Sequence, residues 1–259
     1  MILCVSPNLC YDRVLIVPGF GVGSVHRAAR AIPLAGGKGL NVARAAAALG
    51  ESPVVIGFIG GAAGDAIARG ARQGGLILDA VRVPGESRRC TIIVDPGRAE
   101  TVINERGVVV ERQALRALRR RVRRRLTRTQ VVVLSGSLPP GVPDDRFATL
   151  FADVAPRPTI LDSSGEGLRR GLGAAPTVMK PNRLELEELD GRRLRTLQDV
   201  AAAGRGLRDR GVGWVVVTLG EDGAVVVCAG GAWHLRAPRV ERINAMVARL
   251  LPDVSVRLL

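Results

Sequence analysis

A run of three glycines, one lysine and one asparagine, Gly36-Gly37-Lys38-Gly39-Leu40-Asn41, is the stretch best suited to chemistry. Glycines let the backbone approach a ligand closely. The alanine-rich run from Ala43 to Leu49 predicts a helix directly afterwards, whose N-terminus presents unpaired N–H groups and a positive dipole end. The amide of Asn41 can donate to and accept from a sugar hydroxyl. The stretch therefore suits an anionic or polyhydroxylated ligand; the alternative is a glycine loop that only turns the chain into a packed helix.

Lysine is rare in this chain, which makes its positions informative. Of 38 lysine and arginine residues, only Lys38 and Lys180 are lysines. Where arginine is so strongly preferred, a lysine indicates a position that needs a compact ammonium group rather than a planar guanidinium. Both lysines lie inside motifs, one in the glycine run and one in Met179-Lys180-Pro181-Asn182.

Apolar runs separated by helix-like segments predict a parallel sheet with crossover helices. The predicted strands span residues 2–6, 53–59, 130–134, 159–161, 177–179 and 214–217. Residues 60–65 are predicted as a loop and 66–72 as a helix. Several strands end in small polar residues, among them Ser137, Asp162, Lys180 and Thr218. Because ligands bind at the carboxyl ends of parallel strands, these residues predict a polar crevice.

Short β-rich segments broken by glycines predict a flap beside the sheet. Residues 13–17 and 25–34 are two such segments, and 88–95 with 99–104 predict a hairpin around Pro96-Gly97. Asp12 follows the first strand, where parallel sheets bind ligands. Arg27 is a candidate for gripping a phosphate, and Arg88 and Asn104 could face a ligand under the flap. An exposed flap is also an expected homodimer surface.

The composition allows one large α/β domain, since 47% of 259 residues are hydrophobic. The net charge of +14 is dispersed except in a predicted helix over 111–128, where Leu115, Leu118, Val122 and Leu126 share one face and arginines cover the rest. We favour a surface helix over a nucleic-acid-binding one, because base readout needs polar readers that this helix lacks. Aromatic residues, at 3%, are too scarce for stacking platforms.

Cys4, Cys10, Cys90 and Cys228 lie far apart, which disfavours a zinc site or a disulfide framework. No apolar run reaches membrane length, and the N-terminus lacks a basic region before a long apolar core. We therefore expect a cytoplasmic protein with no membrane partner.

Five segments, in this order and spacing, resemble the ribokinase-like (PfkB) carbohydrate kinases, nearest to the 1-phosphofructokinase and tagatose-6-phosphate kinase branch. They are GGKGLNVA, SGSLPPGVP, LDSSGEGL, MKPNRLELEEL and VVVTLGEDGAVVV, and the resemblance covers about residues 1–243. It implies a three-layer α/β/α sandwich with a mainly parallel central sheet and a small β-flap. The expected organisation is one domain over 1–259, with flap segments at about 11–35 and 86–107.

The resemblance also implies two binding sites and a reaction. The reaction would be ATP- and Mg²⁺-dependent phosphorylation of fructose 1-phosphate, fructose 6-phosphate or tagatose 6-phosphate, and phosphoryl transfer asks mainly for alignment and charge neutralisation. The residues implied for the sugar phosphate are Asp12, Gly36, Gly37, Asn41, Arg88 and Ser137, with Arg27 and Lys38 as phosphate partners. The residues implied for ATP are Lys180, Asn182, Glu185, Thr218, Gly220 and Gly223.

Asn182 and Glu185 are the expected magnesium residues, acting through water. They lie three apart at a predicted helix start, so both side-chain oxygens can face one hydrated ion. The alternative for Glu185, with Glu187 and Glu188 beside it, is an ordinary acidic helix face.

The family pattern continues with Gly-Ala-Gly-Asp, whose Asp is the general base, and this chain departs from it. Aligned from Asn244, the base position falls on Leu250, and neither glycine of the anion hole is present. Leucine cannot take a proton, so no catalytic residue is predicted. The family's C-terminal part is expected to be missing after about residue 244. One hypothesis is a reading-frame shift or deletion, which translation of the downstream DNA would test.

Three functions follow. The first is a hexose-phosphate kinase by descent, feeble or inactive as written. The second is a non-catalytic protein that binds a sugar phosphate or a nucleotide. The third and least favoured is a nucleic-acid binder acting through residues 111–128.

Overall fold

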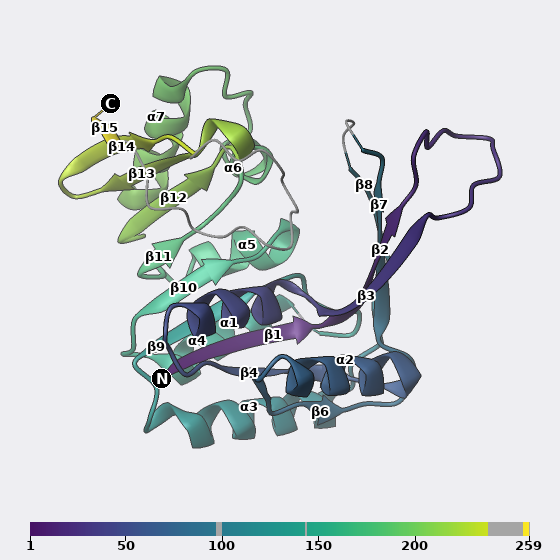
Figure 1. Ribbon diagram of the computed structural model, residues 1–259. Coiled ribbons are helices and arrows are strands. Elements are labelled where there is room, and N and C mark those ends of the chain that lie inside the picture. The colour runs from purple at the N-terminus through teal and green to yellow at the C-terminus, as the bar shows by residue number, and fades with distance from the viewer. Residues whose placement is uncertain (97–99, 143, 238–255, 259) are drawn as a thin grey trace. The chain divides into compact units, whose positions relative to one another are not determined.

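The computed structural model describes residues 1–96, 100–142, 144–237 and 256–258 (Figure 1). Internal contacts divide the chain into two units. The N-terminal unit comprises Met1–Gln130 and Ser135–Pro143, and the C-terminal unit comprises Val131–Leu134 and Asp144–Leu259.

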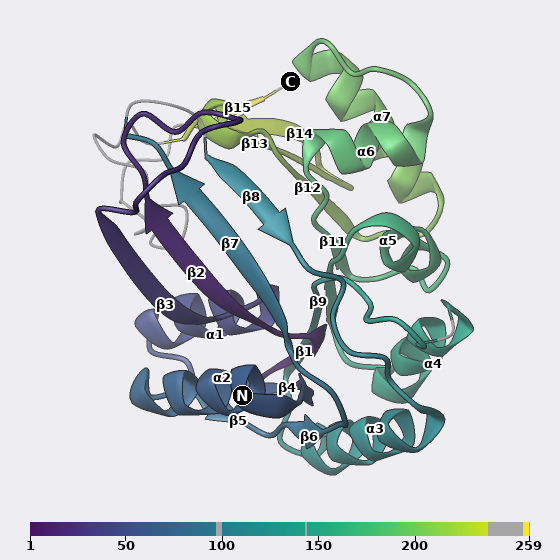
Figure 2. The same ribbon diagram turned by 90° about the vertical axis from the view of Figure 1, so that its right-hand side faces the viewer.

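The N-terminal unit is built on two buried parallel strands, β1 (Ile2–Asn8) and β4 (Val54–Ile59). The short strands β5 (Ile77–Leu78) and β6 (Val81–Arg82) pair parallel with β4. Helices α1 (Lys38–Ala48) and α2 (Gly61–Gln73) lie on one face of these strands, and α3 (Arg112–Leu126) lies on the other (Figure 2). Leu3, Val5, Val55 and Ile56 are fully buried in these strands because both faces of the pair are covered by helices.

The flap is a separate four-stranded sheet in the same unit. Its strands are β2 (Cys10–Ile16), β3 (Arg30–Gly36), β7 (Arg88–Val94) and β8 (Thr101–Asn104), in the order β3-β2-β7-β8. The β7–β8 pair is antiparallel, which confirms the predicted hairpin, although Gly97 to Ala99 lie outside the described residues. Asp12 lies within β2, not in a loop after β1 as the sequence suggested, because Cys10 onward already pairs with β3 and β7.

The predicted loop over 60–65 is wrong, since α2 begins at Gly61. The small residues there are helical because the carboxylate of Glu86 accepts hydrogen bonds from the backbone N–H groups of Ala62 and Ala63. A partner distant in sequence thus satisfies the first N–H groups of the helix, which a local pattern cannot reveal.

The amphipathic helix predicted over 111–128 is confirmed as α3. Leu115, Leu118 and Val122 are buried, and the helix contacts β4 and β6. Arg121, Arg124 and Arg125 all donate to the carboxylate of Asp79, which follows β5 and is only 9% exposed. Part of the arginine face is therefore bound to the protein itself. Within the described ranges, every helix is too short or too polar to cross a membrane.

The C-terminal unit is a layer of strands covered by helices. The strands are β9 (Val131–Ser135), β10 (Thr159–Asp162), β11 (Val178–Met179), β12 (Trp214–Thr218), β13 (Ala224–Cys228), β14 (Gly231–Leu235) and β15 (Val256–Leu258). From β9 to β12 neighbouring strands follow chain order, with β10–β11 and β11–β12 parallel; β13, β14 and β15 continue the sheet antiparallel. The helices are α4 (Asp144–Val154), α5 (Gly165–Leu172), α6 (Arg183–Asp190), α7 (Leu197–Asp209) and the short 3₁₀ helix η1 (Gly220–Asp222).

Candidate functional site

Asp12 is a buried carboxylate at the base of the flap. Its side chain fills the space beside Gly36, where an added Cβ would lie 2.0 Å from Asp12 Oδ2. The thiol of Cys10 donates to Asp12 Oδ1 over 2.7 Å. Burial raises the pKa of Asp12, while the Cys10 hydrogen bond and the charges of Arg88 and Arg44 act in the opposite direction. Burying the Asp12 carboxylate costs free energy, and a hydrogen bond donated by a ligand hydroxyl would offset part of that cost.

The glycine run enters α1 directly, as predicted. Gly37 is the N-cap, with a positive φ of 103° that L side chains rarely adopt. The N–H of Gly39 donates to the hydroxyl of Ser6 over 3.3 Å, and a Cβ on Gly39 would lie 2.4 Å from Ser6 Cβ. Lys38, the first helical residue, is half-buried. The three glycines therefore let α1 begin against β1 and Asp12.

Asn41 lies in the first turn of α1, where a neighbouring arginine holds its amide. Arg44 Nη1 donates to Asn41 Oδ1 over 2.8 Å, and Arg44 Nη2 donates to the backbone carbonyl of Ala35. Asn41 itself is exposed. Arg44 was not predicted as a site residue, although its spacing of three from Asn41 on a predicted helix was a usable signal.

Arg88 and Ser137 are brought together through Asn8. Arg88 Nε donates to the carbonyl of Asn8 and Arg88 Nη1 donates to Asn104 Oδ1, each over 3.1 Å. The Asn8 amide donates to Ser137 Oγ over 3.0 Å and to the carbonyl of Arg106 over 3.1 Å. Because Ser137 accepts this bond, its own hydroxyl hydrogen can be donated elsewhere. The sequence analysis gave Asn8 no role in a site.

Arg27 is not brought to this cluster by the described contacts. It is exposed, in the segment that joins β2 to β3. That segment begins after the last β2–β3 pair, Ile16–Arg30. This pair lies six residues along the strands from the Cys10–Gly36 pair, which is a distance of about 20 Å at 3.4 Å per residue. A phosphate-binding role for Arg27 stays a prediction.

Three of the predicted nucleotide residues gather at one edge of the C-terminal unit. Lys180 follows β11, and its Nζ lies 3.2 Å from Asp162 Oδ1 at the end of β10. Asn182 forms a parallel bridge with Thr218 at the end of β12, and the N–H of Thr218 donates to the carbonyl of Pro181 over 3.0 Å. This placement matches the polar edge that the strand endings predicted.

Asn182 and Glu185 form the capping box of α6, which the sequence analysis did not expect. Asn182 Oδ1 accepts from the N–H of Glu185, and Glu185 Oε2 accepts from the N–H of Asn182, each over 2.8 Å. Each of the two side chains thus gives one oxygen to the helix cap, and their magnesium role through water stays a prediction. Among the residues that the structure describes, no group of three or more His, Cys, Asp or Glu side chains could hold a metal. Such a cluster is not needed for Mg²⁺, which usually binds through one or two protein oxygens, waters and substrate phosphates.

Gly220 and Gly223 shape the turn between β12 and β13. Both have positive φ values, and the N–H of Leu219 donates to the carbonyl of Gly223 over 2.8 Å. A Cβ on Gly223 would lie 1.9 Å from the carbonyl oxygen of Leu235, so this glycine is required by packing. Nothing lies within 4 Å of a Cβ built on Gly220, which leaves its surface open.

The three buried cysteines, Cys4, Cys10 and Cys90, are poor nucleophiles. Burial raises the pKa of Cys4 to about 12 and raises the pKa of Cys10 and of Cys90. All four cysteines are free thiols, which agrees with the expectation that there is no disulfide framework.

The family model for "pfkB family carbohydrate kinase" matches residues 2–246. This chain belongs to the pfkB family of carbohydrate kinases. Its enzymes are phosphotransferases with an alcohol acceptor, they use ATP, and the mainly parallel sheet with covering helices matches their ribokinase-like fold.

Two solved structures illustrate the similarity. Phosphofructokinase-2 from Escherichia coli, in complex with fructose-6-phosphate, is 27% identical with a TM-score of 0.84; the match covers 94% of this chain and 82% of that one. A protein described as a possible 1-phosphofructokinase from Thermotoga maritima is 26% identical with a TM-score of 0.83, and the match covers 93% and 78%. Both carry the phosphofructokinase name that the five motifs suggested.

The predicted base position of the pfkB family, Leu250, lies outside the described residues, as does Asn244. The family match ends at residue 246, close to the point where the sequence departs from the Gly-Ala-Gly-Asp pattern.

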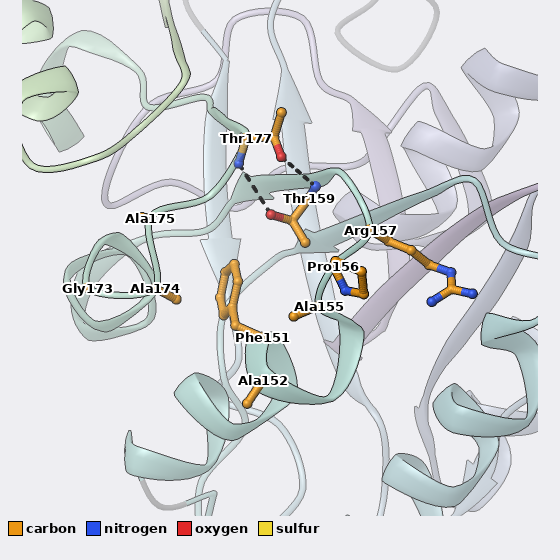
Figure 3. A pocket seen from close by; sticks show the side chains of 10 residues that line it. All are labelled: Phe151, Ala152, Ala155, Pro156, Arg157, Thr159, Gly173, Ala174, Ala175 and Thr177. Atoms are coloured by element: carbon orange, nitrogen blue, oxygen red, sulfur yellow. Dashed lines mark hydrogen bonds between the residues drawn. The ribbon is translucent and has the colours of Figure 1, made fainter.

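A cavity of about 480 Å³ lies at the opposite ends of β10 and β11 from Asp162 and Lys180. Thr159 and Thr177 are hydrogen-bonded to each other there, and each hydroxyl accepts a hydrogen bond from the backbone N–H of the other residue (Figure 3). Phe151 forms part of the wall, and the guanidinium of Arg157 points away from it (Figure 3). This cavity is separate from the predicted nucleotide residues.

Proposed function

We propose that the chain is a phosphofructokinase-like sugar kinase by descent that binds a ketohexose phosphate in its N-terminal unit and ATP in its C-terminal unit. The observation that carries this proposal is the Asp12 cluster: a buried carboxylate beside Gly36, with Arg88, Ser137 and the start of α1 as donors. The candidate acceptors are fructose 1-phosphate, fructose 6-phosphate and tagatose 6-phosphate.

The two ends of the sugar phosphate would meet opposite chemistry. Asp12 would accept a hydrogen bond from a sugar hydroxyl, since a carboxylate is an acceptor when ionised. Arg88 uses two of its five N–H donors on Asn8 and Asn104, so three remain for the phosphate. Lys38 and the N-terminus of α1 would add positive potential.

ATP is the second substrate and supplies the phosphoryl group. Lys180 would contact its phosphates, exchanging part of its interaction with Asp162, and Thr218 with the open surface of Gly220 would border the nucleotide. Magnesium is the usual partner of nucleotide phosphates. Asn182 and Glu185 each give one oxygen to the capping box, and the proposal keeps them as the residues that would hold a hydrated magnesium ion through water.

Slow turnover is the second part of the proposal. A general base contributes about 10²–10⁴-fold to a rate, and the chain carries leucine at that aligned position. The test is coupled ADP release with the three sugar phosphates, and phosphofructokinase-2 from Escherichia coli as positive control. Turnover within about tenfold of the control would overturn the impairment.

A non-catalytic sugar-phosphate binder is the second candidate. It is favoured because the Asp12 cluster could bind a ligand while leucine stands at the aligned position of the general base, Leu250. It predicts thermal stabilisation by sugar phosphate or ATP without ADP release. Failure of all three sugar phosphates to stabilise the protein would overturn both candidates.

We also propose that the flap joins two copies of the chain. Val102 and Ile103 on the outer strand β8 are 51% and 56% exposed, and an uncovered edge strand favours pairing with another chain. Light scattering after gel filtration tests this, with Ile103→Lys expected to give a monomer. A monomeric parent protein at 50 µM would contradict it.

A further inference from the structure

Arg44 connects three elements around the proposed sugar-phosphate site. It is carried by α1, it donates to Asn41 in the first turn of that helix, and it donates to the carbonyl of Ala35 at the end of β3. Its charge also acts on Asp12 in β2.

We propose that Arg44 is a positioning residue that fixes how Asn41 and Asp12 meet a sugar phosphate. The inference rests on the proposed function of this cluster, and it assigns Arg44 no direct contact with the ligand.

Arg44 fixes the orientation of the Asn41 amide. A guanidinium carries only donors, so the atom that Arg44 contacts must be the amide oxygen. This contact, at 2.8 Å, turns Oδ1 toward the helix and leaves the two hydrogens of Nδ2 for other partners. Asn41 is exposed, so those hydrogens are available. With Arg44 occupying one lone pair of Oδ1, the amide presents its Nδ2 donors outward, which suits a phosphate or a sugar oxygen.

Arg44 also holds the backbone beside Gly36. Arg44 Nη2 donates to the carbonyl of Ala35, which precedes the glycine that touches Asp12. One side chain therefore ties α1 to the strand end that packs on the carboxylate. The planar fork of arginine can bond Asn41 and Ala35 together, whereas the single ammonium of lysine is a point charge.

The charge of Arg44 also acts on the Asp12 carboxyl. The groups that act on Asp12 are Cys10 on its own strand, Arg88 and Cys90 on β7, and Arg44 on α1. Burial raises the pKa of Asp12, and Arg44 and Arg88 are the two cations that counter it. Loss of Arg44 would therefore raise the pKa of Asp12 further and reduce the ionised fraction of this acceptor at a given pH.

The experiment measures fructose 6-phosphate affinity by calorimetry for Arg44→Met, Arg44→Lys, Asn41→Ala and the Arg44→Met/Asn41→Ala double variant. Arg72→Met, on α2, is the matched control, because Arg72 is exposed and makes no described side-chain contact. We expect about tenfold weaker binding for Arg44→Met, partial recovery for Arg44→Lys, and a change of less than about twofold for the control, as for an ordinary surface residue. In the double variant the loss should be smaller than the product of the single losses, because the two residues act together.

A ligand-free measurement separates this inference from the proposed function. Carbon-13 NMR titration of the Asp12 carboxyl should show a higher pKa in Arg44→Met than in the parent, and no change in Arg72→Met. If the parent binds no sugar phosphate but the pKa rises, the proposed function fails and the coupling of Arg44 to Asp12 stands. If the parent binds and Arg44→Met binds equally well, the positioning role is overturned. An unchanged Asp12 pKa overturns it as well, whether or not the parent binds. If Arg44→Met does not fold, Arg44→Lys with Asn41→Ala provides the same cycle.

Discussion

Asp12 combines a proposed binding role with a stability cost. Its pKa is raised by burial, so the folded state binds a proton more tightly than the unfolded state does. Stability from this group is fully present below the unfolded pKa and is lost as pH rises through the folded pKa. At pH 7 Asp12 therefore lowers the free energy of unfolding relative to acid pH.

Replacing Asp12 with asparagine should separate these effects. We expect Asp12→Asn to raise the melting temperature at pH 7, and to lose that advantage near pH 3, because Asp12 is then protonated in both states. Sugar-phosphate affinity should fall by about 10–100-fold, as for the loss of a charged hydrogen bond. Calorimetry and thermal unfolding check this, with Asp65→Asn on the surface as control. Lower stability at pH 7 would contradict it.

Asp79 is expected to show the opposite pH dependence. Burial opposes its ionisation, but hydrogen bonds from Arg125 and Arg121 outweigh burial and lower the pKa of this carboxyl. Its stabilisation is present above the unfolded pKa and is lost as pH falls through the folded pKa. We expect Asp79→Asn to lower the free energy of unfolding by about 1–3 kcal/mol at pH 7 in urea titrations, and to match the parent at about pH 2. A constant difference across this range would count against the ion pairs as the cause.

Residue types predicted part of the sugar-phosphate cluster. Asp12, Gly36 and Arg88 are adjacent in the structure although they come from three separate strands. Asn8 and Arg44 were missed because their importance lies in bonds to partners on other segments. Roles in ligand binding stay predictions for all of them.

At the scale of elements, the first turn of α1 depends on the absence of a side chain at residue 39. Gly39→Ala should lower the free energy of unfolding by about 1–3 kcal/mol, because the new Cβ would overlap buried Ser6 and overpacking outweighs the helix preference of alanine. Gly206→Ala, in α7 with nothing within 4 Å, is the matched control and should stabilise by about 0.5–1 kcal/mol. Equal effects in urea denaturation would refute the packing argument.

The chain provides a matched pair of capping boxes. Asn182 and Glu185 cap α6, and Thr196 and Asp199 cap α7 in the same way. We expect Asn182→Ala and Thr196→Ala each to cost about 1 kcal/mol of stability. If Asn182 also serves the nucleotide, only Asn182→Ala should weaken Mg²⁺·ATP binding in calorimetry; equal affinities would leave it a purely structural cap.

Element boundaries were predictable where the signal was local. The helix after the glycine run and the β7–β8 hairpin follow from spacing and turn residues. The start of α2 does not follow from a local signal, because Glu86, 24 residues away in sequence from Ala62, accepts hydrogen bonds from the first N–H groups of the helix. Asp12 was misplaced for a similar reason: pairing across the flap, rather than its own residue pattern, makes its segment a strand. The capping box of α6 had a local signal, Asn followed three residues later by Glu, which the magnesium interpretation obscured.

For the whole molecule, the charge of +14 should draw anionic ligands over long range. We expect the affinity for fructose 6-phosphate to fall roughly threefold between 50 and 300 mM KCl, because the Debye length shortens from about 14 to 6 Å. Calorimetry over this range is the measurement, with Arg116→Gln on α3 as a control that should change little. Duplex DNA binding that persisted at 300 mM KCl would instead support the nucleic-acid role of α3. The expectation of one domain over 1–259 stays a prediction beside the two units described above.

The contact between Gly36 and Asp12 constrains how this protein can change over generations. Any side chain at residue 36 would overlap the Asp12 carboxylate and force it to move. A smaller side chain at residue 12 would leave a void against β3. Neither position can drift alone without a loss, so lineages with a different acidic group here should also differ at the neighbouring strand. Engineers who wish to alter the accepted sugar should therefore randomise the two codons as one unit.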